Sequence, residues 1–145
     1  MSKEPFIVLL AEDDEHDIVA TKRAWKKHHI ANPLYIVNNG EECLDYLHQR
    51  GKYSEQDAAP RPGILLLDIK MPKMDGLAVL EHIRKDGELR HLPIIILTTS
   101  KAEEDRVRSY DLGVNAYIVK PVGFENFSEA VRTISLFWEL VELPV

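Results

Sequence analysis

Two features are scarce in this sequence: cysteine, which occurs once as Cys43, and long hydrophobic runs. A single cysteine cannot close an intrachain disulfide or build a thiolate cage around a metal. The apolar stretches at residues 6–11 and 93–97 fall far short of the roughly 20 residues of a membrane-spanning helix, and the N-terminus lacks the apolar segment of a signal peptide. We therefore expect a cytoplasmic protein without membrane contact, in which Cys43 is a buried structural thiol.

Basic charge is also limited, since 18 Lys and Arg residues face 24 Asp and Glu residues and the net charge is −6. The basic clusters, at residues 22–23 and 26–29, are short. A negative net charge repels the phosphate backbone of nucleic acids, so nucleic acid is not expected as a direct partner. With 45% hydrophobic residues in a length of 145, the chain can fill the core of one domain.

Short apolar runs alternate with helical patterns along the whole chain. The apolar runs that predict strands are residues 6–11, 34–37, 64–68, 93–98 and 116–119. The segments that predict helices are residues 15–29, 41–49, 77–85, 103–112 and 125–143. This alternation is typical of a parallel sheet covered by helices on both faces. It predicts an α/β fold, a doubly wound (βα)5 unit with a five-stranded parallel sheet. For such a sheet we expect the common flavodoxin-like strand order 2-1-3-4-5.

On this prediction residues 1–145 form a single domain with an extended C-terminal helix, and no sequence remains for an output domain. The one long irregular connection, residues 51–62, is interpreted as a surface loop without a functional role.

Acidic residues follow two of the predicted strands. The first strand leads into Glu12, Asp13 and Asp14, and the third ends at Asp68. These strands are neighbours in such a sheet, so their carboxylates converge at its carboxyl edge. Carboxylates this close repel one another unless one is protonated or a cation neutralises them, and an all-oxygen set suits Mg²⁺. Taken alone, residues 12–14 also fit a solvated acidic loop.

Two further strand ends add a hydroxyl and an ammonium. The fourth strand ends at Thr98, and the fifth leads into Lys120 and Pro121. Carboxylates, a metal ion, a hydroxyl and a lysine around one aspartate suit phosphoryl transfer, in which aspartate can be the nucleophile. Each residue has an ordinary structural interpretation when taken singly: a capping hydroxyl for Thr98, a surface charge for Lys120 and packing for Tyr117. Their joint placement at consecutive strand ends favours a functional site.

The ordered set of motifs resembles the receiver domain of two-component response regulators over almost the whole chain. The matching stretches are residues 7–14, 65–76, 93–98 and 113–121. The resemblance implies that Asp68 accepts a phosphoryl group from the phosphohistidine of a histidine kinase. It also implies a site for Mg²⁺ or Mn²⁺.

The same resemblance implies a role for each matching residue. The metal would be bound by Glu12, Asp13, Asp68 and the main-chain carbonyl of Lys70. Thr98 would bind a phosphoryl oxygen, and Lys120 would form an ion pair with the phosphoryl group. The Lys120–Pro121 peptide bond would be cis. Tyr117 would turn inward as Thr98 moves. Phosphorylation would then change the face formed by the fourth helix, the fifth strand and the fifth helix.

Residues 108–113 and 137–144 resemble, more narrowly, the stand-alone receivers that serve bacterial and cyanobacterial phytochrome histidine kinases. A light-sensing kinase is therefore the expected partner. A generic single-domain receiver or phosphorelay intermediate unrelated to light is the alternative.

The predicted C-terminal helix is apolar nearly all round in its final turns. One face packs on the sheet, while Leu136, Leu140 and Leu143 cluster on the opposite side. An exposed apolar patch is typical of a binding surface, so we expect a homodimer, or a kinase contact, through this helix. The alternative is a helix end that folds back under its own tail.

Two other function classes fit the sequence less well. An aspartate-nucleophile phosphatase or phosphotransferase would have a second acid two residues after the nucleophile, where this chain has Lys70. A phosphorylation-independent binding module would be expected to lack Asp13, Asp68 or Lys120, but this chain has all three. The histidines, at positions 16, 28, 29, 48, 82 and 91, show no metal-ligand spacing together with acids and are expected in solvated or capping roles.

Overall fold

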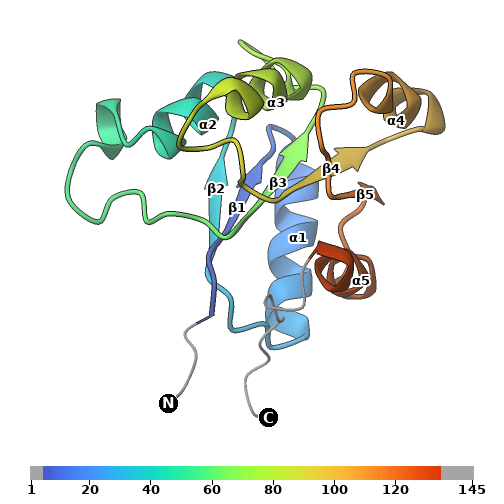
Figure 1. The fold of residues 1–145 in the computed structure, drawn as a ribbon. Coiled ribbons are helices and arrows are strands. Elements are labelled where there is room, and N and C mark those ends of the chain that lie inside the picture. Colours follow the sequence, from blue (N-terminus) through green and yellow to red (C-terminus); the bar gives the residue numbers. More distant parts are fainter. Residues whose placement is uncertain (1–4, 135–145) are drawn as a thin grey trace.

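A computed structural model describes residues 5–134 and contains a parallel sheet between two layers of helices (Figure 1). The strands are β1 (Val8–Ala11), β2 (Leu34–Val37), β3 (Ile64–Asp68), β4 (Ile94–Thr98) and β5 (Ala116–Val119). They pair in parallel in the order β2-β1-β3-β4-β5. The predicted strand order is therefore confirmed.

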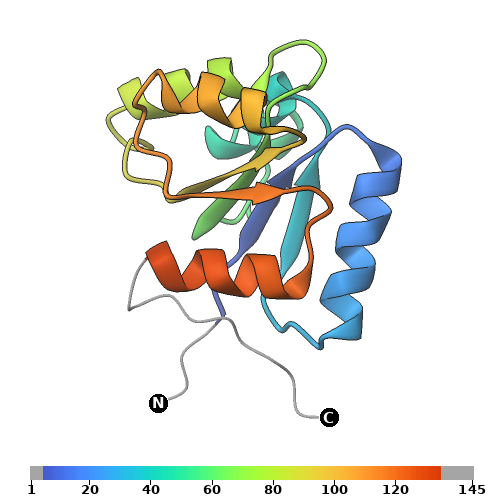
Figure 2. The same cartoon turned by 90° about the vertical axis from the view of Figure 1, so that its right-hand side faces the viewer.

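Helices cover both faces of the sheet. They are α1 (Glu15–Lys27), α2 (Gly40–Leu47), α3 (Gly76–Lys85), α4 (Lys101–Arg108) and α5 (Phe124–Ile134), with a short 3-10 turn, η1 (Gly51–Tyr53), after α2. Figures 1 and 2 show α2, α3 and α4 on one face and α1 and α5 on the other. Within the described residues no helix is long and apolar enough to cross a membrane.

Alternate strand residues form two separate cores. Leu9, Leu65 and Ile96 pack with α2, α3 and Val107 of α4. Their sequence neighbours point to the opposite face, where Leu66 packs with Trp25 of α1 and Phe127 of α5. Because β1, β3 and β4 are buried on both faces, their sequences read as continuous apolar runs rather than alternating ones.

Several predicted boundaries are corrected. The first strand starts at Val8 rather than at residue 6, and α1 and α2 end two residues earlier than predicted. Helix α4 runs from Lys101 to Arg108 instead of residues 103–112, because Ser100 caps its start and the chain turns through Asp111 and Gly113, which have φ angles of 49° and 68°. Helix α5 is described to Ile134. The predicted interface residues Leu136, Leu140 and Leu143 lie outside the described residues.

Two smaller predictions concern the α2 side of the sheet. Cys43 is completely buried, and burial raises the pKa of its thiol to about 12, as expected for a structural cysteine. The connection at residues 51–62 contains η1 and is anchored by the Tyr46 hydroxyl, which donates a hydrogen bond to the Pro60 carbonyl at 2.7 Å. It leads into the amino end of β3, away from the carboxyl edge.

Close backbone packing fixes the connection after β3. The amide of Gly76 donates to the Ile69 carbonyl at 2.8 Å. A Cβ atom at position 76 would collide with the Asp68 carbonyl and with Ile69 Cα, both of which are backbone atoms. Only glycine fits there, so Gly76 sets the path of the chain directly behind Asp68.

Candidate functional site

Four neighbouring strands deliver the candidate residues to one edge of the sheet. Asp68 is the last residue of β3 and pairs in register with Leu97, one residue before Thr98 at the end of β4. Glu12 follows β1, and Lys120 follows β5. The predicted convergence at the carboxyl edge is therefore observed, and it follows from the parallel register of the strands.

Lys120 joins the acidic residues of the site. Its Nζ atom lies 2.6 Å from Glu12 Oε1, 3.1 Å from Asp68 Oδ1 and 3.1 Å from Asp17 Oδ2. Burial alone would lower the pKa of Lys120, but the hydrogen bond to Glu12 and the charge of Asp68 outweigh it and raise that pKa. The ammonium is therefore a permanent positive charge at the centre of the site. Asp17, in the first turn of α1, was not predicted from the sequence as part of the site.

Asp68 is held in an environment that opposes its negative charge. Its side chain is almost completely buried, as is that of Glu12. Burial, followed by the charge of Glu12, raises the pKa of Asp68 from 3.8 to about 7 despite the opposing effect of Lys120. A pair of buried carboxylates with one partly protonated is the arrangement that a bound cation relieves.

The acidic triplet after β1 divides into three roles. Glu12 Oε2 accepts hydrogen bonds from the amides of Asp13 at 3.1 Å and Asp14 at 3.2 Å, which fixes its carboxylate. Asp13 is exposed at the mouth of the site. Asp14 caps α1 by accepting from the Asp17 amide at 3.0 Å. One oxygen from each of Glu12, Asp13 and Asp68 lies within 4.8 Å of the others, and among residues 5–134 no comparable set includes Asp14.

Thr98 has an unmet hydrogen-bonding requirement. The residue is completely buried, and its Oγ1 atom has no hydrogen-bond partner among the residues that the structure describes. Buried hydroxyls are nearly always hydrogen-bonded in folded proteins. The Thr98 hydroxyl is therefore available to hydrogen-bond a group that binds in the site.

Glu103 lies beside the site and was missed from the sequence. Its Oε1 atom accepts from the Thr99 amide at 3.1 Å, and its Oε2 atom is 3.8 Å from Lys70 Nζ. Ser100 in turn accepts from the Glu103 amide at 3.2 Å. The Ser-x-x-Glu pattern of residues 100–103 is the signature of a helix capping box and could have identified this residue.

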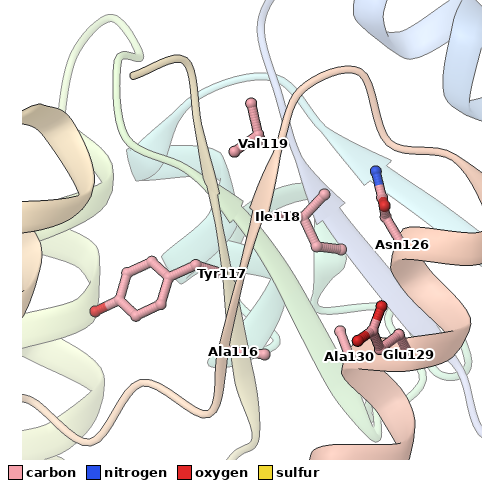
Figure 3. A pocket seen from close by; sticks show the side chains of 7 residues that line it. All are labelled: Ala116, Tyr117, Ile118, Val119, Asn126, Glu129 and Ala130. Atoms are coloured by element: carbon pink, nitrogen blue, oxygen red, sulfur yellow. The ribbon is translucent and has the colours of Figure 1, made fainter. Parts of the chain in front are cut away.

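Tyr117 does not reach the acidic site. It lies on β5 with its ring pointing away from α5, whereas Ile118 points toward α5 (Figure 3). The guanidinium carbon of Arg108 is 4.1 Å from the centre of the Tyr117 ring, and Arg108 Nε donates to Glu104 at 2.7 Å. This cation–π contact holds the ring against α4. The Lys120–Pro121 bond is cis, as the resemblance implied.

The family of the chain follows from comparison with known proteins. A family model described as the response regulator receiver domain matches residues 8–132. The chain belongs to this family. Receiver domains work with histidine kinases in phosphorylation-dependent two-component signalling, so the comparison confirms the fold and the receiver interpretation.

Individual receivers resemble the chain over nearly its full length. Response regulator Rcp1 of Synechocystis sp. is 36% identical over 144 residues, which cover 99% of this chain and 96% of Rcp1. The structure of the bacteriophytochrome response regulator AtBRR is 42% identical, with a TM-score of 0.88 over 96% of this chain and 99% of AtBRR. The Mn²⁺-bound form of Rcp1 matches with a TM-score of 0.73 and 34% identity, over 97% of this chain and all of that one.

Proposed function

We propose that this receiver domain is the phosphoacceptor of a two-component system and that Asp68 takes the phosphoryl group from a partner histidine kinase. The observation that carries the proposal is the pairing of Lys120 with Asp68, at 3.1 Å, beside the buried hydroxyl of Thr98, which has no hydrogen-bond partner in the described part of the chain. A phosphoryl group on Asp68 would offer oxygen acceptors to both. The domain would catalyse its own phosphorylation and dephosphorylation and transform no other substrate.

The transfer needs one nucleophile and fixed positive charge. A carboxylate oxygen of Asp68 would attack the phosphorus of phosphohistidine, the P–O bond would form, and the P–N bond would break with its electron pair going to the imidazole nitrogen. Lys120 would neutralise negative charge on the phosphoryl oxygens, and the Thr98 hydroxyl would donate to one of them. Positioning and charge compensation supply most of the catalysis in such a transfer.

The acidic residues fit a divalent cation. Glu12 and Asp68 are two buried carboxylates, and burial and the charge of Glu12 raise the pKa of Asp68 to about 7. A bound cation would offset the repulsion between these carboxylates. We propose that Glu12, Asp13, Asp68 and the main-chain carbonyl of Lys70 hold Mg²⁺ or Mn²⁺, which prefer such oxygen ligands. Bound there, the ion would supply a charge that neutralises the phosphoryl oxygens. The Mn²⁺-bound form of the relative Rcp1 supports this assignment.

We also propose that Thr98 and Tyr117 report the phosphorylation. Thr98 would move toward the phosphoryl group, and Tyr117 would leave Arg108 and turn inward, changing the face made by α4, β5 and α5. Only contacts that differ between the unphosphorylated and phosphorylated conformations can shift the equilibrium between them. The contact of Arg108 with the outward Tyr117 ring would exist only in the unphosphorylated conformation. Replacing Arg108 with Gln should therefore favour the inward ring and prolong the phosphorylated state, measured as slower loss of the phosphoryl mass. A lifetime unchanged by this variant would contradict the proposed switch.

The relatives support a phytochrome-type kinase as the partner. AtBRR is a bacteriophytochrome response regulator of nearly the same length as this chain. Phosphotransfer from an autophosphorylated bacteriophytochrome kinase should be much faster than from a histidine kinase without a light-sensing module, at equal concentrations. Equal rates from both kinases would favour the generic receiver or phosphorelay intermediate.

We propose further that residues 1–145 act as a single domain and that two copies associate through the C-terminal helix and the neighbouring β5 face. β5 is an edge strand in the described sheet, and Val119 on it is 59% exposed. Figure 3 shows a pocket beside Val119 between β5 and α5, also lined by Asn126 and Glu129. Sedimentation with and without phosphorylation tests the dimer. A monomer in both states, unchanged by Leu140→Glu, would contradict it.

Acetyl phosphate with Mg²⁺, followed by intact mass, tests phosphorylation without a kinase. One added phosphoryl group is expected, and it should be absent in Asp68→Asn and without Mg²⁺. Asp14→Asn is the matched control, because Asn also caps a helix and Asp14 lies outside the metal-type cluster. Fast turnover of diverse phosphomonoesters would instead indicate a phosphatase.

A further inference from the structure

Two histidines and an aspartate meet on the outer side of α2 and α3, at the end of the sheet opposite Asp68. His48 Nε2 lies 2.9 Å from His82 Nε2 and 3.7 Å from Asp86 Oδ2, and one ligand atom from each residue lies within 4.8 Å of the others. We propose that His48, His82 and Asp86 form a second metal site, selective for Zn²⁺ or a similar transition-metal ion rather than for Mg²⁺.

The fold brings these side chains together through the ends of two helices. His48 is the C-cap of α2, while His82 and Asp86 lie one turn apart at the end of α3. α2 and α3 lie side by side on the same face of the sheet (Figure 1). The carboxyl ends of both helices carry partial negative charge, which favours a cation at this position.

The carboxylate is oriented by the backbone. Asp86 Oδ1 accepts hydrogen bonds from the amides of Glu88 at 2.9 Å and Leu89 at 3.1 Å. These two bonds and the nearby histidines lower the pKa of Asp86, so its carboxylate is ionised, and Oδ2 is turned toward His48. Metal-ligating carboxylates are commonly held by outer hydrogen bonds in this way.

The two imidazoles are close to a ligating geometry. Zn–N bonds of about 2.0–2.1 Å at a tetrahedral angle would place the two Nε2 atoms about 3.3 Å apart, so the observed 2.9 Å requires the rings to separate by a few tenths of an ångström. The ring planes are nearly perpendicular, at 85°. Both rings would carry their proton on Nδ1, freeing each Nε2 lone pair, and water would complete the four ligands.

The ligand chemistry separates this cluster from the acidic site. Imidazole nitrogen suits Zn²⁺, Cu²⁺ or Ni²⁺, whereas a set of carboxylate and carbonyl oxygens suits Mg²⁺ or Mn²⁺. The competing explanation is a metal-free hydrogen bond in which one Nε2–H donates to the other ring. The two explanations differ in whether zinc binds and in whether Asp86 matters for it.

The full chain, freed of metal with a chelator and returned to excess Mg²⁺ so that the acidic site is occupied, is titrated with Zn²⁺ against a chromophoric competitor. One Zn²⁺ per chain is expected. Loss of groups that only orient metal ligands weakens binding about 10- to 100-fold, so His82→Asn and Asp86→Asn should weaken it by at least that factor. His91→Asn, an exposed histidine outside the cluster, is the matched control and should leave the affinity unchanged.

Ring-nitrogen NMR of the unmodified protein covers the case of a variant that fails to fold. The Nε2 resonances of two histidines should shift on adding Zn²⁺ in excess Mg²⁺ and stay in place on adding Mg²⁺ alone. Absence of zinc binding, or binding that neither His82→Asn nor Asp86→Asn alters, would overturn the site and leave the metal-free hydrogen bond. Either result is independent of whether Asp68 is phosphorylated.

Discussion

The two ends of the sheet carry two polar clusters of opposite design. At the carboxyl edge, Glu12 and Asp68 are buried around Lys120. At the other end, His48 and His82 meet on the surface between two helices. The first cluster gathers oxygen ligands and an ammonium, as phosphoryl chemistry requires, and the second gathers nitrogen ligands. Because the first cluster is buried, the pKa of Asp68 depends strongly on the charges around it. The geometry of the second cluster depends on how α2 packs against α3.

The largest expected effect is at Lys120. Lys120→Met removes the ammonium that neutralises both Asp68 and the proposed phosphoryl oxygens. Removal of one such stabilising group from an enzyme costs about 10²–10³ in rate, and a similar loss is expected here in phosphorylation by acetyl phosphate at saturating Mg²⁺, followed by intact mass. Lys101→Met changes an exposed lysine at the start of α4 and should keep the normal rate. A normal rate in Lys120→Met would remove Lys120 from the mechanism.

Gly76 links the fold to the acidic site. In Gly76→Ala the new methyl group collides with the backbone at Asp68 and Ile69, so the unfolding free energy should fall by about 3 kcal/mol, as in strongly overpacked sites. Gly87→Ala adds a methyl group with no atom within 4 Å and should change stability little. Urea unfolding of both variants measures the difference. Equal effects would show that the turn behind Asp68 is not tightly packed.

The pH dependence of stability tests the burial of Asp68. Its pKa of about 7 in the folded state exceeds 3.8, so the folded protein binds more protons between those pH values and loses stability as pH rises through them. Without divalent metal, Asp68→Asn should therefore be more stable than the unmodified protein at pH 8, by at most about 4 kcal/mol because the substitution also removes the contact with Lys120, and the gain should vanish near pH 4. Thermal unfolding across this range measures it. A gain that is independent of pH would contradict the raised pKa.

The smallest expected effects are changes in melting temperature that distinguish the two clusters by the metal ion each one binds. Mg²⁺ should raise the melting temperature of the unmodified protein and of His82→Asn, but not that of Asp13→Asn. Zn²⁺ added in excess Mg²⁺ should raise it further in the unmodified protein and not in His82→Asn, because each ion stabilises the folded state only where it binds. If either variant lost both responses, the clusters would not be independent.

The part of the acidic site built at strand ends was predictable because the arrangement of the parallel strands determines it. Asp68 and Thr98 end neighbouring parallel strands, so identifying the strands places their side chains at one edge. Asp17 was missed because its contact with Lys120 joins positions 103 residues apart, through the angle of α1. The contact of Arg108 with Tyr117 depends in the same way on where α4 ends.

The histidine cluster could not be read from the sequence. His48 and His82 are 34 residues apart on different helices, and only the packing of α2 on α3 brings their rings together. Helix ends are also the least certain boundaries in a sequence, and both His48 and Asp86 are C-cap residues. A strand delivers its last residue to a known edge, whereas a helix end can face several directions.

Phosphorylation of Asp68 can be located directly on the chain. After brief exposure to a phosphorylated histidine kinase or to acetyl phosphate with Mg²⁺, reduction with borohydride converts an aspartyl phosphate to homoserine, and peptide mass spectrometry locates the converted residue. Conversion at position 68 alone is predicted. Conversion at Asp13 or at another carboxylate, with Asp68 intact, would contradict the account.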